Sequence, residues 1–216
     1  MDFRNFSGVS LIIGAALLVG AHPVYAQDSR LELRQTVNAI LGDDQRLAQA
    51  SEQGRRRATL CKYCHGPTGN SVKSHVPNLA GQNAIYLALQ FEKFANGERT
   101  DYVMTPLANN MTRADRINLS IFFSQQDVAS SHDVDPGLAK RGSFIYDTRC
   151  QSCHGRDALG KEHMPRLAGQ PGEYLTQALR AFRQGDSDRA RSPMQEVAAG
   201  LSDDDLAAVV AYLSGL

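Results

Sequence analysis

An internal duplication constrains the fold of this chain more than any other feature of its sequence. Three landmarks occur twice in the same order: CKYCHG at 61–66 and CQSCHG at 150–155, HVPNLAGQ at 75–82 and HMPRLAGQ at 163–170, and MTRADRINLSIFFS at 111–124 and LSDDDLAAVVAYLS at 201–214. The spacing between equivalent residues drifts by only one or two positions along the repeat. The sequence therefore predicts two copies of one fold.

The small size of each copy limits how it can be stabilised. A copy spans about 80–90 residues, a length at which an apolar core alone gives a domain little stability. We therefore expect another component to complete each core.

The local sequence patterns predict helices. Residues 83–96 and 172–184 read as equivalent helices, and a further helix leads into each cysteine pair. Thr112 and Ser202 are predicted to cap the last helix of each copy, because an aspartate follows three residues later. Sustained alternation of polar and apolar residues, the pattern of a half-buried strand, is absent. The expected fold class is all-α, with long loops.

The first 26 residues read as an export signal. An apolar run of 14 residues, Gly8–Ala21, is followed by small residues at Val24 and Ala26. A membrane-spanning helix needs about 20 apolar residues, so cleavage after Ala26 is favoured over an uncleaved anchor. With no cysteine near the cut, a lipoprotein is excluded.

The repeat and the signal together divide the chain into five segments. These are a signal peptide at 1–26, an N-terminal helical extension at 27–50, a first domain at 51–129, a linker at 130–136 and a second domain at 137–216. The extension has no counterpart in the second copy. Its apolar residues, among them Leu31 and Val37, suggest an amphipathic helix that docks on this chain or on a partner.

A Cys-x-x-Cys-His motif in each copy is the candidate chemical site. The residues are Cys61, Cys64 and His65 in the first copy, and Cys150, Cys153 and His154 in the second. Two thiols on one helical turn can attach to the two vinyl groups of one haem, and the next residue then offers an imidazole to the iron.

Other uses of a cysteine pair fit less well. A zinc site needs its second pair closer in sequence, and a thioredoxin-like pair belongs in a strand–helix–strand context. A disulfide within one helical turn has poor geometry. The motifs therefore predict two covalently attached haem c groups, each with one iron.

Methionines matched across the repeat are the candidate sixth ligands. Met104 and Met194 each lie seven residues before the start of the closing segment, and a thioether suits an iron that shuttles single electrons. Met111 aligns with a leucine and is predicted to pack in the core. His75 and His163 also occupy equivalent positions; we expect surface or propionate-adjacent side chains, with sixth ligands as the alternative.

Charge composition narrows the range of partners. The chain has 23 basic and 23 acidic residues and no net formal charge. A strongly basic surface for nucleic acid is therefore excluded. Beyond the first 26 residues no run is long and apolar enough to cross a bilayer, so we expect peripheral membrane association at most.

Taken together, these motifs resemble the class I cytochromes c, and the two-domain arrangement is similar to the diheme cytochromes of the c-four type. The resemblance covers about residues 50–216. It implies two tandem domains, each a small helical fold wrapped around one haem. It also implies that Pro77 and Pro165 accept a hydrogen bond from the proximal imidazole, and that Gly54 and Gly142 let the last helix cross closely, against Phe122 and Tyr212 respectively.

The same resemblance implies a function. If protein ligands occupy both sides of each iron, the chain is an electron carrier and not an enzyme. The family relays single electrons in the bacterial periplasm, so expected partners are redox proteins such as a membrane cytochrome complex, a terminal oxidase or a dehydrogenase. Two alternatives stay open: an electron-accepting subunit of a larger dehydrogenase, and a diheme redox enzyme such as a peroxidase.

Overall fold

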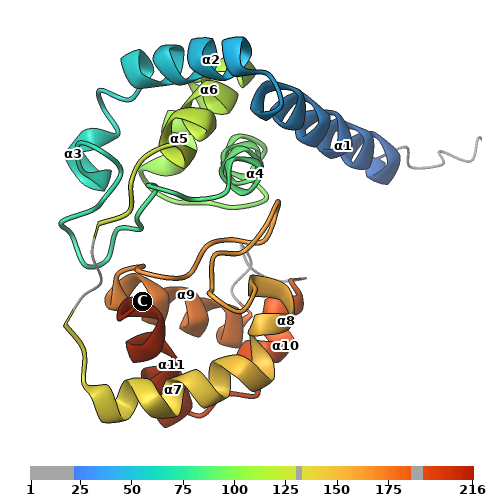
Figure 1. The fold of residues 1–216 in the computed structure, drawn as a ribbon. Coiled ribbons are helices and arrows are strands. Elements are labelled where there is room, and N and C mark those ends of the chain that lie inside the picture. The colour runs from blue at the N-terminus through green and yellow to red at the C-terminus, as the bar shows by residue number, and fades with distance from the viewer. Residues whose placement is uncertain (1–21, 130–132, 186–191) are drawn as a thin grey trace, which may run out of the picture.

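A computed structural model of the chain describes residues 22–129, 133–185 and 192–216 (Figure 1). Over these ranges the chain is helical, with one isolated β-bridge between Lys161 and Met164 and no strand. The predicted all-α fold class is confirmed. Most of the expected signal peptide, and residues 130–132 of the expected linker, lie outside the described residues. No helix within the described ranges is both long enough and apolar enough to span a bilayer.

The helices repeat in order, with one addition at the N-terminus. The first half contains α1 (His22–Leu41), α2 (Asp44–Arg57), α3 (Lys62–His65), α4 (Ala84–Ala95), α5 (Met104–Asn109) and α6 (Arg113–Ser124). The second contains α7 (Pro136–Arg149), α8 (Gln151–His154), α9 (Gly172–Gln184), α10 (Pro193–Ala199) and α11 (Asp203–Ser214). Helices α2 to α6 therefore recur as α7 to α11, and α1 has no counterpart among the residues that the structure describes.

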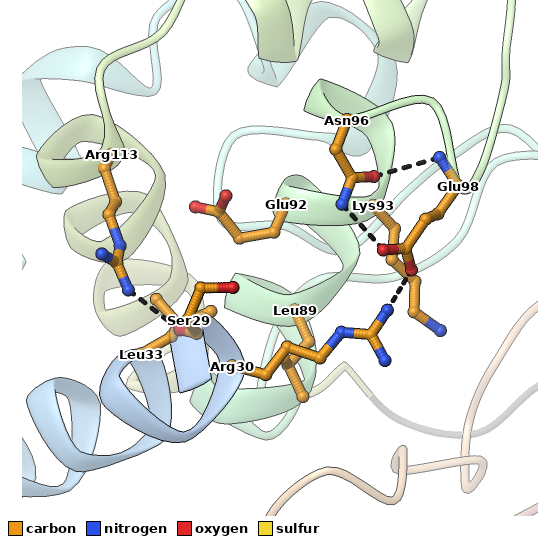
Figure 2. Close-up of a pocket in the computed structure, with 9 residues that line it drawn as sticks. All are labelled: Ser29, Arg30, Leu33, Leu89, Glu92, Lys93, Asn96, Glu98 and Arg113. Atoms are coloured by element: carbon orange, nitrogen blue, oxygen red, sulfur yellow. Dashed lines mark hydrogen bonds and ion pairs between the residues drawn. The ribbon is translucent and has the colours of Figure 1, made fainter. Parts of the chain in front are cut away.

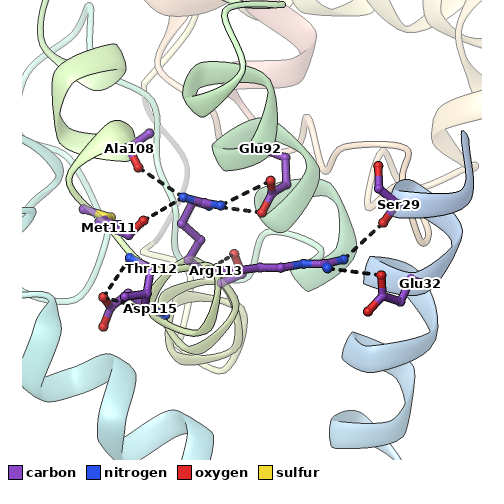
Figure 3. A network of polar contacts seen from close by, with 10 residues as sticks. Ser29, Glu32, Glu92, Ala108, Met111, Thr112, Arg113 and Asp115 are labelled. Atoms are coloured by element: carbon purple, nitrogen blue, oxygen red, sulfur yellow. Dashed lines mark hydrogen bonds and ion pairs between the residues drawn. The ribbon is translucent and has the colours of Figure 1, made fainter. Parts of the chain in front are cut away.

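The two closing helices, α6 and α11, start with the caps that their sequences predict. Thr112 Oγ1 accepts from the Asp115 backbone N–H at 3.1 Å, and Asp115 Oδ2 accepts from the Thr112 backbone N–H at 3.1 Å (Figure 3). Ser202 and Asp205 form the same reciprocal pair at the start of α11. Each box satisfies backbone N–H groups that have no partner within the helix.

In each copy the closing helix crosses the opening helix, which is α2 in the first copy and α7 in the second, at a glycine. A Cβ atom on Gly54 would lie 2.6 Å from Phe122 Cβ, and one on Gly142 would lie 2.8 Å from Tyr212 Cβ. Only a residue without a side chain permits this approach, as the resemblance implied. The crossing places α2 on α6 and α7 on α11, and each cysteine pair follows directly from the opening helix.

Helix α1 packs against the first copy. Leu33 and Val37 are buried, at 1% and 0% exposure, in a cluster with residues of α4 and α6. Figure 1 shows α1 beside α4 at one end of the molecule. The extension therefore docks on this chain. It also differs from the expected short helix, because α1 ends at Leu41 and α2, which begins at Asp44, runs through residue 50.

Two ion pairs and one hydrogen bond hold the docked helix on the first copy. Arg30 pairs with Glu98 (Figure 2), and the Arg113 guanidinium bonds the Ser29 carbonyl oxygen at 3.1 Å (Figures 2 and 3). Arg113 also reaches a Glu32 carboxylate oxygen at 3.2 Å (Figure 3). A fourth contact crosses to the second copy, where Arg34 Nη2 lies 2.6 Å from Glu162 Oε2.

Candidate haem sites

Each Cys-x-x-Cys-His motif forms a single helical turn. In the first copy the backbone N–H groups of Cys64 and His65 donate to the Cys61 carbonyl oxygen at 3.2 and 2.9 Å. In the second copy the corresponding bonds to the Cys150 carbonyl oxygen are 3.2 and 3.0 Å. This turn brings the two thiols and the imidazole of each copy together, which is the spacing that attachment of one haem requires.

The four cysteines are free thiols in the structure and are not joined in disulfides. Burial raises the pKa of the Cys61 thiol, and it raises the pKa of the Cys150 thiol to about 11. These two sulfurs therefore lie in apolar surroundings, where they pack against the core cluster of their own copy. The position suits thiols that join an apolar macrocycle.

The two motif histidines are buried and held in one orientation. His65 is 7% exposed and His154 is 4% exposed. His65 Nδ1 lies 2.9 Å from the Pro77 carbonyl oxygen, and His154 Nδ1 lies 3.1 Å from the Pro165 carbonyl oxygen. Because a carbonyl oxygen can only accept, Nδ1 carries the proton in both rings.

Burial also sets the charge of these rings. Desolvation lowers the pKa of His65 and of His154, against the opposing effect of the proline carbonyl. A neutral ring protonated at Nδ1 has its lone pair on Nε2, the form that binds a metal. The paired thiols and the oriented, neutral imidazoles fit one haem in each copy.

The candidate methionines begin equivalent short helices. Met104 is the first residue of α5 and its backbone N–H donates to Asp101 Oδ1 at 2.8 Å. Met194 is the second residue of α10 and its N–H donates to Ser192 Oγ at 3.3 Å. Met104 packs against the same core cluster as Cys61. Both methionines lie at a helix start and not in an open loop, and both are partly exposed.

The remaining candidates take other places. His75 and His163 are exposed, and His163 lies 3.8 Å from a Glu162 carboxylate oxygen. Met111 packs against the core of the first copy, as predicted. Among the residues that the structure describes, no three His, Cys, Asp or Glu side chains form a group that could hold a metal ion.

The loop after each motif shows a difference between the copies that the repeat does not reveal. Gly69 has φ +88°, and its equivalent, Ala158, has φ +54° with a side chain. A Cβ atom on Gly69 would lie 2.8 Å from Phe123 Cδ1. The second copy has Leu213 at the position of Phe123, and Ala158 is fully buried in the same cluster as Leu213.

Two buried glutamines that the sequence analysis did not single out join the copies. The Gln82 amide donates to the Arg166 carbonyl oxygen at 2.9 Å and accepts from the Arg166 backbone N–H at 2.7 Å. The Gln170 amide makes the same pair of bonds with Asn78, at 2.9 and 3.0 Å. Both glutamines end the repeated P-x-L-A-G-Q segment, and that repetition is the signal that could have identified them.

An arginine of the first copy also reaches the second. The Arg99 guanidinium lies 4.5 Å from the centre of the Phe94 ring and donates to Gln90 Oε1 at 2.8 Å. It also has a side-chain hydrogen bond with Tyr174 of the second copy. A cation is thereby fixed close to the contact between the copies.

The comparisons with known proteins agree on one family. The cytochrome c family model matches residues 139–216. Cytochrome c4 of Pseudomonas aeruginosa is 33% identical over 175 residues, covering 76% of this chain and 87% of the relative. The thiosulfate dehydrogenase electron acceptor of Stutzerimonas stutzeri is 30% identical, covering 74% and 80%.

A solved structure extends this agreement to the three-dimensional fold. Reduced recombinant cytochrome c4 from Pseudomonas stutzeri aligns with a TM-score of 0.69 and 30% identity, covering 77% of this chain and 98% of that one. At 77% of this chain, the match is longer than one copy. The chain therefore belongs to the cytochrome c4 family: it is a diheme class I cytochrome c, an electron carrier and not an enzyme, with two covalently bound haem c groups.

Proposed function

We propose that each copy binds its haem through the residues of one motif and one methionine. The attachment sites are Cys61 and Cys64 in the first copy, and Cys150 and Cys153 in the second. The iron ligands are His65 and Met104 in the first copy, and His154 and Met194 in the second. Pro77 and Pro165 orient the histidines through their carbonyl oxygens.

One observation carries this assignment. In both copies a buried, neutral imidazole donates from Nδ1 to a proline carbonyl oxygen, so that Nε2 is the metal-binding nitrogen. The free thiols on the preceding turn and the matched methionines provide the other groups that a six-coordinate haem c needs.

The role of the protein follows from this coordination. When bound, each haem supplies an iron that gains or loses one electron. The histidine and the methionine of each copy would hold the iron and leave no position on it for a substrate. The surrounding residues bury the imidazole, hold its orientation and exclude water. Electrons therefore pass between this protein and redox partners without a bond forming to the iron.

The protein acts in the periplasm. The N-terminal apolar run supports export with cleavage after Ala26, and the relatives are cytochromes of the same type. Partners of matching chemistry are a membrane cytochrome complex, a terminal oxidase or a dehydrogenase. Encounters between such proteins bury less than about 1,200 Å², which suits rapid release.

The decisive experiment is a potentiometric titration of the purified protein followed by optical and magnetic spectroscopy. We expect two low-spin haems, each with one histidine and one methionine ligand, and no binding of carbon monoxide by the resting reduced protein. Rapid carbon monoxide binding without denaturation would show that one iron is open, and the carrier function would have to be abandoned.

A second candidate is the role of electron acceptor for a sulfur-compound dehydrogenase. Relatives described as thiosulfate dehydrogenase electron acceptors support it, and so does a solved thiosulfate dehydrogenase from Marichromatium purpuratum, with a TM-score of 0.63 and 29% identity. This chain covers 40% of that structure's chain. Reduction of the purified protein by a thiosulfate dehydrogenase with thiosulfate, in a stopped-flow assay, tests this role; a second-order rate no greater than that for an unrelated c-type cytochrome would exclude it.

A further inference from the structure

One peptide group connects His65 to the contact between the copies. The peptide between Pro77 and Asn78 accepts from His65 Nδ1 through its oxygen at 2.9 Å. The same peptide donates through its nitrogen to Gln170 Oε1 at 3.0 Å. A side chain of the second copy is thus connected to the histidine of the first by two hydrogen bonds on one rigid, conjugated unit.

The second copy has the same arrangement in reverse. The peptide between Pro165 and Arg166 accepts from His154 Nδ1 at 3.1 Å and donates to Gln82 Oε1 at 2.7 Å. The relationship is therefore reciprocal across the contact. Each copy supplies the glutamine that bonds the peptide holding the histidine of the other.

These hydrogen bonds influence one another. An acceptor on the N–H side of a peptide polarises the group and makes its carbonyl oxygen a stronger acceptor, by roughly 10–30% per bond. Asn78, Gln82 and Gln170 are buried, at 7%, 4% and 3% exposure. Little water can therefore replace the glutamine oxygen or screen its effect.

We propose that Gln170 and Gln82 are positioning residues that tune the reduction potential of the haem in the opposite copy. Gln170 acts on His65 through the peptide between residues 77 and 78, and Gln82 acts on His154 through the peptide between residues 165 and 166. This inference rests on the proposed function, which makes the two histidines iron ligands.

The direction of the effect follows from the charge on the imidazole. A stronger acceptor at Nδ1–H draws the proton away from the ring and makes the ring a better electron donor. A better donor stabilises the ferric state more than the ferrous state, so the intact contact lowers the potential. Removing the glutamine weakens the bond at Nδ1 and raises the potential of the opposite haem.

Reciprocity gives a second consequence. If the contact between copies favours the ferric state, the ferric state must favour the contact by the same free energy. Oxidation of the first haem strengthens the bond from His65 Nδ1, which polarises the Asn78 N–H toward Gln170. The contact between the copies is therefore tighter in the oxidised protein than in the reduced protein.

The test uses Gln170→Leu and Gln82→Leu in the full-length holoprotein. Two midpoint potentials are followed by NMR, with the hyperfine-shifted methyl signals of each haem assigned through its own cysteines. In Gln170→Leu we expect the ferric-to-ferrous equilibrium constant of the first haem to fall roughly twofold to fivefold, an upward shift of about 20–40 mV at 59 mV per tenfold. Gln82→Leu shifts the second haem instead.

A matched control comes from the same contact. Asn83 Nδ2 donates across it to the carbonyl oxygens of Met164 and Leu159, at 2.7 and 3.1 Å. Neither oxygen belongs to a peptide that bonds a histidine ring; the peptide between Leu159 and Gly160 donates only to the backbone carbonyl oxygen of His154, at 2.8 Å. Asn83→Ala should therefore weaken the contact and leave both potentials unchanged. The inference is wrong if each glutamine variant shifts the haem of its own copy, or both haems equally, or if Asn83→Ala gives the same shift.

A measurement on the unaltered protein covers the case in which a variant does not assemble. Hydrogen exchange of the Asn78 and Arg166 amides should be slower in the oxidised protein than in the reduced protein. Equal exchange in the two states would overturn the proposal. Failure of the proposed function has a different signature, because the unaltered protein would then lack the spectra of histidine–methionine ligation.

Discussion

Gly54 faces Asn118 so closely that a Cβ atom on residue 54 would lie 2.1 Å from the Asn118 carbonyl oxygen. The contact is with backbone of α6, so no side-chain rotation can relieve it. Opening and closing helices of the first copy can pack at this distance only because residue 54 has no side chain. The motif that starts at Cys61 follows directly from this crossing.

Gly54→Ala should therefore destabilise the first copy by about 1–3 kcal/mol, the usual cost of overpacking. Thermal unfolding of the holoprotein measures the loss. Gly42→Ala is the matched control, because a Cβ atom there would lie no closer than 3.4 Å to any neighbour, Asn38 O being the nearest. Equal stability of the two variants would show that the helix crossing tolerates a side chain.

Met104→Ala and Met194→Ala should each remove the weak long-wavelength band of thioether–iron ligation from one haem only. In the proposed coordination each copy supplies one methionine ligand, and alanine offers none. Met111→Leu introduces the residue that the second copy has at this position and should leave both bands. Unchanged optical spectra in both alanine variants would show that the ligand assignment is wrong.

Leu33→Ala should destabilise the protein by about 2–5 kcal/mol, because the side chain is 1% exposed in the cluster between α1 and the first copy. Leu31→Ala removes the same atoms from the same helix where the residue is 54% exposed. It should change stability by less than about 0.5 kcal/mol. Chemical denaturation of both variants checks the difference, and similar losses would argue against docking of α1 on its own chain.

Arg116 stabilises α5, which begins with Met104. Its guanidinium donates to the carbonyl oxygens of Ala108 and Met111 at 3.2 and 2.7 Å, and its Nε lies 3.0 Å from Glu92 Oε1. The side chains of this ion pair are 13% and 28% exposed.

Arg116→Leu, the residue of the second copy, should therefore cost about 2–3 kcal/mol, because it leaves a half-buried carboxylate unpaired. Thermal unfolding measures this cost. The double variant Arg116→Leu/Glu92→Gln should recover part of it, since the unpaired charge is gone. A double variant as unstable as the sum of the two single variants would show that the pair is not coupled.

The capping box of α11 should make the free energy of unfolding depend on pH. Hydrogen bonds from Ser202, and then from Arg141, hold the pKa of Asp205 below its ordinary value of 3.8. A carboxyl whose pKa is lower in the folded state stabilises the protein above the unfolded value, and this contribution is lost as the pH falls through the folded value.

Asp205→Asn should thus lower the melting temperature at neutral pH, and the difference from the unaltered protein should narrow as the pH falls below about 3.8. Asp204→Asn removes the same charge from the same helix end without touching the cap, and it controls for the helix dipole. A melting difference that stays constant from neutral pH to pH 3 would contradict this account.

Much of the site could be predicted from local patterns. The spacing of Cys61, Cys64 and His65 describes one helical turn, and a turn is determined by residues within four positions of one another. The helix caps at Thr112 and Ser202 also depend only on residues close in the sequence, and the structure confirms both. The alignment of the repeat also picked out Met104 and Met194, since comparing two copies shows which positions are shared.

The tertiary structure alone decided how the two copies meet. Gln82 bonds Arg166, 84 residues away, and Gln170 bonds Asn78, 92 residues away. The repeat shows that the two glutamines are equivalent, but equivalence does not say what either one contacts. That depends on how two folded surfaces dock, and docking is set by many weak contacts between residues distant in the sequence.

The same reason applies to the N-terminal extension and to Ala158. The amphipathic pattern of residues 27–50 identifies an apolar face, but only the packed structure shows that α4 and α6 cover it. Ala158 has φ +54° although it carries a side chain, and it is buried in the same cluster as Leu213, which another helix contributes. Sequence by itself thus determined the chemistry of each copy, through bonds and turns that are local. Tertiary packing decided the contacts that join the copies to each other and to α1, because those free energies exist only once distant surfaces have met.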